Sequence, residues 1–344
     1  MESVYERDVR SLARDDSGFW DQIDGKRILI TGASGLIGGL AANAILERND
    51  RFGVTSELVA LVRDADHGAQ RLEGRTDTRI LSWDAPSGEV PDVDGIDLIL
   101  HCAATTSSSH MVERPIETIR TIVAGTEAML ELAARTGARM VDVSSMEVYG
   151  SGGKRPLKET TTGSLDTMSA RSSYPAAKQL AEALCAAYVT ERGVHASVAR
   201  LAQTFGAGVS VNDSHIYAEI ARCCIMGTDI VLATDGQKRN MYCYTQDSVR
   251  ALLVLLARGE AGVAYNVANE DTFCSVLEMA QMAANHFSRT TAVRTATTNE
   301  RAGKYAVTGQ IMLDTTRICE LGWEPRYSLM EMYHRMMADW SAYV

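Results

Sequence analysis

The sequence predicts an α/β fold built around a parallel β-sheet and followed by a smaller second domain. From Arg27 to Leu201, short apolar runs of strand length alternate with segments of helix length, and this alternation is typical of βαβ units. The runs are apolar throughout, as in the strands of a parallel sheet that is buried on both faces. After Leu201 the alternation loosens, so a second domain is expected to begin there.

The elements of the first part follow from this pattern. Six strands are predicted, at 27–31, 57–62, 79–83, 97–104, 140–145 and 194–201. Two long helices are predicted at 115–138, which opens with a proline and closes at a glycine, and at 172–193. Residues 1–25 are polar, with a few apolar residues spaced so that a short helix can lie on the rest of the chain, namely Val4, Val9, Leu12, Phe19 and Trp20.

The later elements are less regular. After a loop at 204–215, the sequence predicts a helix near 216–227, a strand at 229–234, a strand and then a helix within 241–259, and a strand at 264–269. Two helices are predicted within 313–340, on either side of a Gly-Trp-Glu-Pro corner.

Composition excludes several classes of protein. The 34 Lys and Arg against 44 Asp and Glu give a net charge of −10, which disfavours nucleic acid and anionic membranes as partners. No apolar stretch approaches the roughly 18 residues of a membrane span, and no targeting segment is seen. The seven cysteines form no CxxC pair and no Cys/His cluster, so we expect free thiols, a cytoplasmic location and no metal site.

A glycine-rich turn follows the first predicted strand. Gly32, Gly35 and Gly38 stand in Thr31-Gly-Ala-Ser-Gly-Leu-Ile-Gly, directly before a helix. Glycines at such a turn let the backbone approach a pyrophosphate, while the helix N-terminus supplies free N–H groups. A dinucleotide site is therefore predicted here, with Ser34, Leu36 and Ile37 as further contacts.

Two further motifs carry hydroxyl groups. Tyr174 precedes Lys178 by four residues at the start of a predicted helix, so both side chains lie on one face. The ammonium is then expected to lower the pKa of the phenol and make it a usable base. Ser144 and Ser145 end the fifth strand, at the carboxyl edge where open α/β sheets bind ligands.

With these three motifs in this order, the chain from about 26 to 325 resembles the extended short-chain dehydrogenase/reductases that modify nucleotide-activated sugars. The resemblance implies a doubly wound (Rossmann) sheet, NAD as cofactor, and a small domain that closes over the sugar nucleotide. It implies Ser145, Tyr174 and Lys178 as catalytic residues, and it places Asp84 and Ala103 at the cofactor. The implied division is an extension at 1–25, a dinucleotide-binding domain at 26–203 with about 235–262, and a substrate domain at about 204–234 with 263–344.

Within this family the chain looks most like UDP-glucuronate decarboxylases and sugar 4,6-dehydratases. Glu147 stands at the position of their functional glutamate, and the segment from Gln203 to Gly206, followed by Asn212-Asp213, is similar to one in the decarboxylases. The resemblance implies further contacts to substrate by Thr105, Ser107, Gln203, Arg239 and Gln310.

The chain also departs from the family pattern. Arg63 follows the second strand where NAD-selective members carry an acid, although Asp64 is adjacent, so NADP is left open. Gln310 aligns with the arginine that decarboxylases use on the sugar carboxylate, and a glutamine cannot neutralise that charge. Arg301 is a candidate for a phosphate contact.

The function predicted is NAD(P)-dependent conversion of a nucleotide sugar through a keto intermediate, with Tyr174 as base and Glu147 as acid/base of the second step. One alternative is a net reductase or dehydrogenase of an activated sugar or polyol, and another is a non-catalytic Rossmann sensor. A homodimer is expected, because the helices at 115–138 and 172–193 carry more apolar positions than one sheet face requires.

Overall fold

The computed structural model describes residues 2–64, 72, 77–104, 108–153, 155–295 and 309–341. Its main element is a parallel seven-stranded sheet with the order β10-β6-β5-β4-β1-β2-β3. These strands are β1 (Arg27–Thr31), β2 (Glu57–Val62), β3 (Thr78–Ser82), β4 (Leu98–His101), β5 (Arg139–Ser145), β6 (His195–Leu201) and β10 (Ala264–Val267). The predicted doubly wound α/β fold is confirmed.

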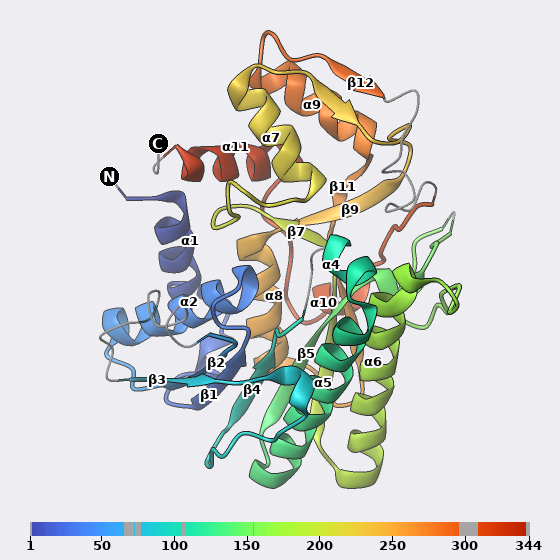
Figure 1. Ribbon diagram of the computed structural model, residues 1–344. Helices are drawn as coiled ribbons and strands as arrows, with labels where there is room; N and C mark the ends of the chain where they lie inside the picture. Colours follow the sequence, from blue (N-terminus) through green and yellow to red (C-terminus); the bar gives the residue numbers. More distant parts are fainter. Residues whose placement is uncertain are drawn as a thin grey trace.

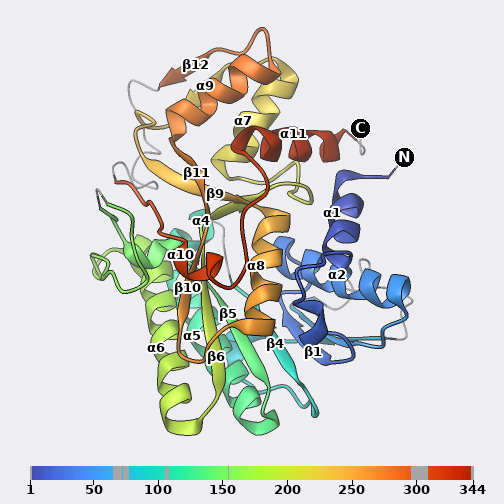
Figure 2. The same cartoon turned by 180° about the vertical axis from the view of Figure 1, so that it is seen from behind.

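Helices cover both faces of this sheet (Figures 1 and 2). Successive residues of a strand point to opposite faces, and β1 illustrates the result. Ile28 and Ile30 pack with α2 (Leu36–Phe52) and α8 (Thr245–Arg258), whereas Leu29 packs with α5 (Pro115–Thr136) and α6 (Ser173–Arg192). This burial on both faces explains why the strands read as unbroken apolar runs.

A second group of elements lies above the carboxyl edge of the large sheet (Figure 1). It contains a three-stranded sheet of β7 (Gln203–Phe205), β9 (Arg239–Tyr244) and β11 (Asn269–Ser275), and a pair formed by β8 (Ile230–Leu232) and β12 (Val293–Thr295). The helices α7 (Ile216–Met226), α9 (Val276–Phe287) and α11 (Leu329–Trp340) pack around them. Shorter elements are α4 (Ser108–Glu113), α10 (Thr316–Cys319) and the 3₁₀ turns η1 (Trp20–Gln22), η2 (Ala85–Ser87), η3 (Met146–Tyr149) and η4 (Ala170–Ser172).

The strand pairing corrects the predicted division of the chain at two places. β10 joins the large sheet beside β6, although its residues were assigned to the substrate domain. β9 joins the smaller sheet, although its residues were assigned to the dinucleotide-binding domain. Both assignments depend on which strands pair with each other. These strands are far apart in sequence, and the local pattern of apolar residues does not indicate their pairing.

β10 is an edge strand, and two of its outer backbone groups form hydrogen bonds with side chains. Arg317 Nη1 donates to the carbonyl of Ala264 at 2.8 Å, and the backbone N–H of Asn266 donates to Glu159 Oε1 at 2.9 Å. Arg317 Nε lies 3.9 Å from the other oxygen of Glu159. An Arg/Glu pair thus takes the place of a neighbouring strand.

The N-terminal extension forms α1 (Val4–Ala13), which packs on α2, α8 and α11. All five apolar residues singled out in this segment are buried, as predicted. Within the part of the chain described, no helix is both long and apolar enough to cross a membrane.

Candidate active site

The glycine turn joins β1 to α2, as predicted. Gly32 has a φ of +64°, and a Cβ there would lie 3.2 Å from the backbone nitrogen of Ala103. A Cβ on Gly38 would lie only 2.5 Å from the carbonyl oxygen of Gly32, so only glycine allows α2 to approach the strand this closely. Gly35 is the N-cap of α2, where the first N–H groups of a helix have no partner within the helix. This turn can hold a pyrophosphate.

On one side of the turn lies a cavity of about 470 Å³. It is lined by seven of the residues considered for the cofactor, namely Gly32, Ser34, Gly35, Arg63, Asp64, Asp84 and Ala103. Arg63 and Asp64 follow β2 directly, so a cation and a carboxylate both stand where a cofactor ribose is expected.

On the other side lies a cavity of about 300 Å³. It shares Gly32, Gly35, Cys102 and Ala104 with the first cavity, so one cleft runs along the carboxyl edge of the sheet. Its lining includes seven further predicted site residues, namely Leu36, Ile37, Gly38, Ser145, Glu147, Tyr174 and Gln203. Three lining residues were not predicted as site residues; they lie between β7 and the first turn of α7 and are Asp213, His215 and Tyr217.

Thr31, the last residue of β1, forms hydrogen bonds to the backbone that follows β4, below the cleft. Its hydroxyl oxygen accepts the N–H groups of Cys102 and Ala103 at 3.0 and 2.9 Å, so its hydrogen is free to go to Nδ1 of His101, 2.8 Å away. The imidazole proton of His101 then sits on Nε2, which lies 4.0 Å from Asp142 Oδ1. Burial lowers the pKa of His101 to about 3, and the ring is therefore neutral.

The three predicted catalytic residues of the hydride step lie together. Ser145 ends β5, and its hydroxyl is close enough to Tyr174 to lower the pKa of that phenol. Lys178, one turn further along α6, is buried and donates to the carbonyl of Val143 at 2.6 Å. It does not line either cavity, but it stands directly behind the residues that do.

The pKa of Tyr174 is raised, which corrects the expected depression by Lys178. Burial of the phenol is the largest cause, followed by the negative charge of Glu147, and the hydroxyl of Ser145 lowers the pKa by less. The spacing of Tyr174 and Lys178 indicated a nearby cation but contained no information about burial. In the protein alone, Tyr174 is a protonated phenol near neutral pH.

Glu147 forms an ion pair that was not predicted. Arg171, in the turn before α6, lies 2.9 Å from its carboxylate. Lys238 is near both, because its charge interacts with that of Glu147 and that of Arg171. Burial lowers the pKa of Lys238. Arg171 stands three residues before Tyr174 in the sequence. This short separation was the one feature of the sequence that indicated a place for Arg171 near the site.

Two predicted substrate residues lie elsewhere. Arg239 pairs with Glu278 of α9 at 2.9 Å, and the backbone of Gln310 pairs with Arg239 and with Gly152. Neither side chain lines the two cavities of the cleft. Thr105, Ser107 and Arg301 lie outside the described residues.

Comparison with known proteins identifies the family. Residues 28–268 match the model of the NAD dependent epimerase/dehydratase family. The chain belongs to this family. It is therefore an NAD-dependent enzyme of the nucleotide-sugar epimerase/dehydratase type, and the predicted membership is confirmed.

Curated relatives of this family member include UDP-glucuronic acid decarboxylase 1 of Arabidopsis thaliana. That protein is 28% identical over 323 residues, which cover 91% of this chain and 69% of the relative. UDP-glucuronic acid decarboxylase 1 of Danio rerio is 29% identical over 265 residues, covering 77% of this chain and 61% of the relative.

Solved structures share the fold. A dTDP-glucose 4,6-dehydratase from Streptomyces venezuelae with NAD bound has a TM-score of 0.77 at 20% identity, covering 92% of this chain and 97% of that one. A UDP-glucuronic acid 4-epimerase from Bacillus cereus, in complex with UDP-glucuronic acid and NAD, has a TM-score of 0.76 at 17% identity, covering 92% and 100%.

We predict that Gly35→Leu abolishes binding of NADH. Gly35 lines both cavities of the cleft, so a leucine side chain there would occupy the space of the pyrophosphate. Binding is measured by fluorescence titration with NADH. Gly153→Leu, outside the cleft, is the matched control and should bind as the unchanged protein does. An unchanged affinity in Gly35→Leu would refute this placement of the cofactor.

Proposed function

We propose that the protein oxidises a ring hydroxyl of a nucleotide-activated sugar, most often at C4, acts on the resulting ketone, and in the complete cycle returns the hydride. The observation that carries this proposal is the single cleft in which Ser145, Tyr174 and Glu147 adjoin the glycine turn. The close approach of Gly38 to Gly32 and the cavity beyond Gly35 fit a dinucleotide. NAD, when bound, supplies the acceptor for the hydride.

Ser145 and Tyr174 carry out the first step. The Ser145 hydroxyl orients the sugar oxygen, and Tyr174 takes the proton of that hydroxyl as the hydride leaves the ring carbon. Tyr174 does this work as a phenolate, and Arg171 is the cation that lowers its pKa. Lys178 stands behind the cleft and holds the end of β5 through the carbonyl of Val143. The oxygen retained on the sugar becomes the ketone.

Glu147 is the acid/base of the second step. A ketone makes the neighbouring C–H or C–C bond easier to break, because the electron pair left behind is delocalised onto the oxygen. Glu147 lines the same cavity as Tyr174, so it can move a proton at the atom next to the ketone. Arg171 holds the Glu147 carboxylate in one orientation.

The sugar is either neutral or a uronate. A neutral sugar was expected from the neutral side chain of Gln310, because a buried unpaired carboxylate costs several kcal/mol. That side chain lines neither cavity of the cleft, so it does not decide between the two kinds of sugar. Decarboxylation of a glucuronate-linked nucleotide is the second candidate, and Arg171 and Lys238 favour it. Arg171 pairs with the Glu147 carboxylate, and the charge of Lys238 interacts with both, so this group of three carries one more positive charge than negative.

The decisive experiment incubates the purified protein with NAD and a panel of UDP-, dTDP-, CDP- and GDP-linked sugars and follows the product mass. Loss of water identifies a dehydratase, loss of carbon dioxide a decarboxylase, and an unchanged mass with a new stereocentre an epimerase. In a parallel incubation with NADH or NADPH in place of NAD, a gain of two hydrogens identifies the net reductase. Binding of NAD with no conversion of any sugar, and with no transient NADH after rapid mixing, would overturn the proposed function and favour a sensor.

We also propose that the protein forms a homodimer through α5 and α6. These helices lie side by side on one face of the sheet (Figure 1). They expose Ile116, Ile119 and Leu180, whose exposed fractions are 67%, 41% and 50%. Sedimentation at micromolar concentration should give a dimer, and Leu180→Glu a monomer. Val231→Glu, at an exposed apolar position of β8, is the control and should remain dimeric. A monomeric unchanged protein would contradict this assembly.

A further inference from the structure

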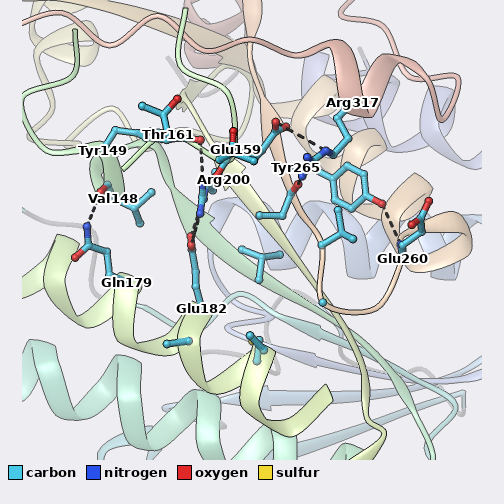
Figure 3. Close-up of a pocket in the computed structure, with 18 of the residues that line it drawn as sticks. Val148, Tyr149, Glu159, Thr161, Gln179, Glu182, Arg200, Glu260, Tyr265 and Arg317 are labelled. Carbon is cyan, nitrogen blue, oxygen red and sulfur yellow. Dashed lines mark hydrogen bonds and ion pairs between the residues drawn. The ribbon is translucent and has the colours of Figure 1, made fainter. Parts of the chain in front are cut away.

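A second large cavity of the molecule is separate from the cleft. It has a volume of about 1110 Å³, is bounded by α6, β6, β10 and residues 159–163, and shares no lining residue with the two cavities of the cleft. Figure 3 shows that Arg200 of β6 and Glu182 of α6 meet in its wall. The family assignment gives this pair no role.

Arg200 and Glu182 form a strong ion pair. The guanidinium donates from Nε at 3.0 Å and from Nη2 at 2.6 Å to the two carboxylate oxygens. Exposed fractions of the side chains are only 13% and 12%. Charge-assisted, two-pronged bonds of this kind are stronger and more directional than ordinary ones. The pair can therefore fix the positions of the elements that it joins.

On one side the pair reaches the end of β5. The Ser144 hydroxyl donates to Glu182 Oε1 at 2.5 Å, and Ser144 immediately precedes Ser145. Glu182 follows Lys178 by four residues and Tyr174 by eight on α6, so all three lie on one face of the helix. Glu182 thus ties the helix that bears Tyr174 to the strand that bears Ser145.

On the other side the pair reaches the turn that bears Glu147. Arg200 Nη1 donates to the Tyr149 hydroxyl at 2.7 Å, and that hydroxyl donates to Asn266 Oδ1 at 2.8 Å. Gln179 of α6 donates to the carbonyl of Val148 at 2.7 Å (Figure 3). The turn η3 is therefore held at its last two residues by groups behind the cleft.

We propose that Glu182 and Arg200 are positioning residues that hold Ser145, Glu147 and Tyr174 in register from behind, through Ser144 and Tyr149. The inference rests on the proposed function of the cleft. Neither residue lines the cleft, so both act through the elements that they join. Arg200 serves the Glu147 turn through Tyr149, whereas Glu182 also serves the end of β5.

This difference predicts a graded result. Glu182→Gln removes the carboxylate that both sides of the network share. It should slow both NADH formation and overall conversion. We expect kcat to fall about 10²-fold, as when reacting groups are misplaced by about 1 Å. Tyr149→Phe, which releases only the turn, should slow overall conversion while leaving the first formation of NADH unchanged. KM for the sugar should stay within about twofold in both variants.

A readout without cofactor or substrate accompanies the kinetics. Hydrogen exchange, followed by mass spectrometry, should become faster in the peptide covering 145–150 of Glu182→Gln and Tyr149→Phe. Glu260→Gln is the matched control, because Glu260 lines the same cavity and loses the same charge without contacting Arg200 or η3 through its side chain. It should leave both the kinetics and the exchange unchanged.

Two results would overturn the inference. One is a wild-type kcat in Glu182→Gln. The other is a loss of activity that merely matches a loss of NAD-binding sites in a titration, since that would reflect misfolded protein. An unchanged protein that binds NAD but converts no sugar and forms no transient NADH would instead refute the proposed function, and the exchange measurement would still test the positioning of η3.

Discussion

Replacing Tyr174 with phenylalanine will leave the binding of NAD unchanged and reduce turnover of the accepted nucleotide sugar by about 10²- to 10⁴-fold. The substitution removes the oxygen that takes the proton of the sugar hydroxyl and keeps the ring that fills the wall of the cleft. Steady-state kcat with the substrate found in the panel measures the loss, and titration with NADH measures binding.

Tyr188→Phe is the control for this variant. Tyr188 lies on the same helix, and its hydroxyl donates to Glu131 on α5 at 2.5 Å, away from the cleft. Its loss should not change kcat. A Tyr174→Phe enzyme that retained half of its turnover would remove Tyr174 from the proposed mechanism.

Replacing Glu147 with glutamine will stop overall conversion but still permit one burst of NADH formation. The amide cannot exchange a proton with the atom next to the ketone, whereas Ser145 and Tyr174 remain in place for the first step. The burst is followed at 340 nm after rapid mixing with substrate, and the final product is followed by mass.

The same variant makes a prediction about pH. The negative charge of Glu147 raises the pKa of Tyr174, so its removal lowers that pKa. Because Tyr174 must be deprotonated to act as base, the rate of NADH formation rises with pH, and in Glu147→Gln this rise should occur at lower pH. A rise at unchanged pH, or overall conversion at the normal rate, would contradict the role given to Glu147.

Local patterns predicted most of the large sheet and the core of the cleft. Ile28, Leu29 and Ile30 read as a buried strand because both of its faces are covered. Gly32 and Gly38 could be placed because a turn and a close approach of backbone leave no room for another residue. These features depend on neighbours within one strand, turn and helix.

The remainder depends on contacts between distant segments. Asp213 and His215 reach the cleft because the smaller sheet lies over the carboxyl edge of the larger one, and Arg171 meets Glu147 across 24 positions of sequence. The raised pKa of Tyr174 has the same origin, because burial of the phenol is set by all the elements around it. The spacing of residues along the sequence does not indicate which distant segments lie close together in the fold.

The covered edge of β10 has a consequence for how copies of the protein meet. An open edge strand offers its N–H and C=O groups to any extended chain and is a common starting point for runaway sheet growth. Here the N–H of Asn266 already donates to Glu159, and Arg317 already donates to the carbonyl of Ala264. A second chain therefore finds two of the outward-facing backbone groups of β10 already hydrogen-bonded, and this disfavours the addition of a strand at this edge of the sheet.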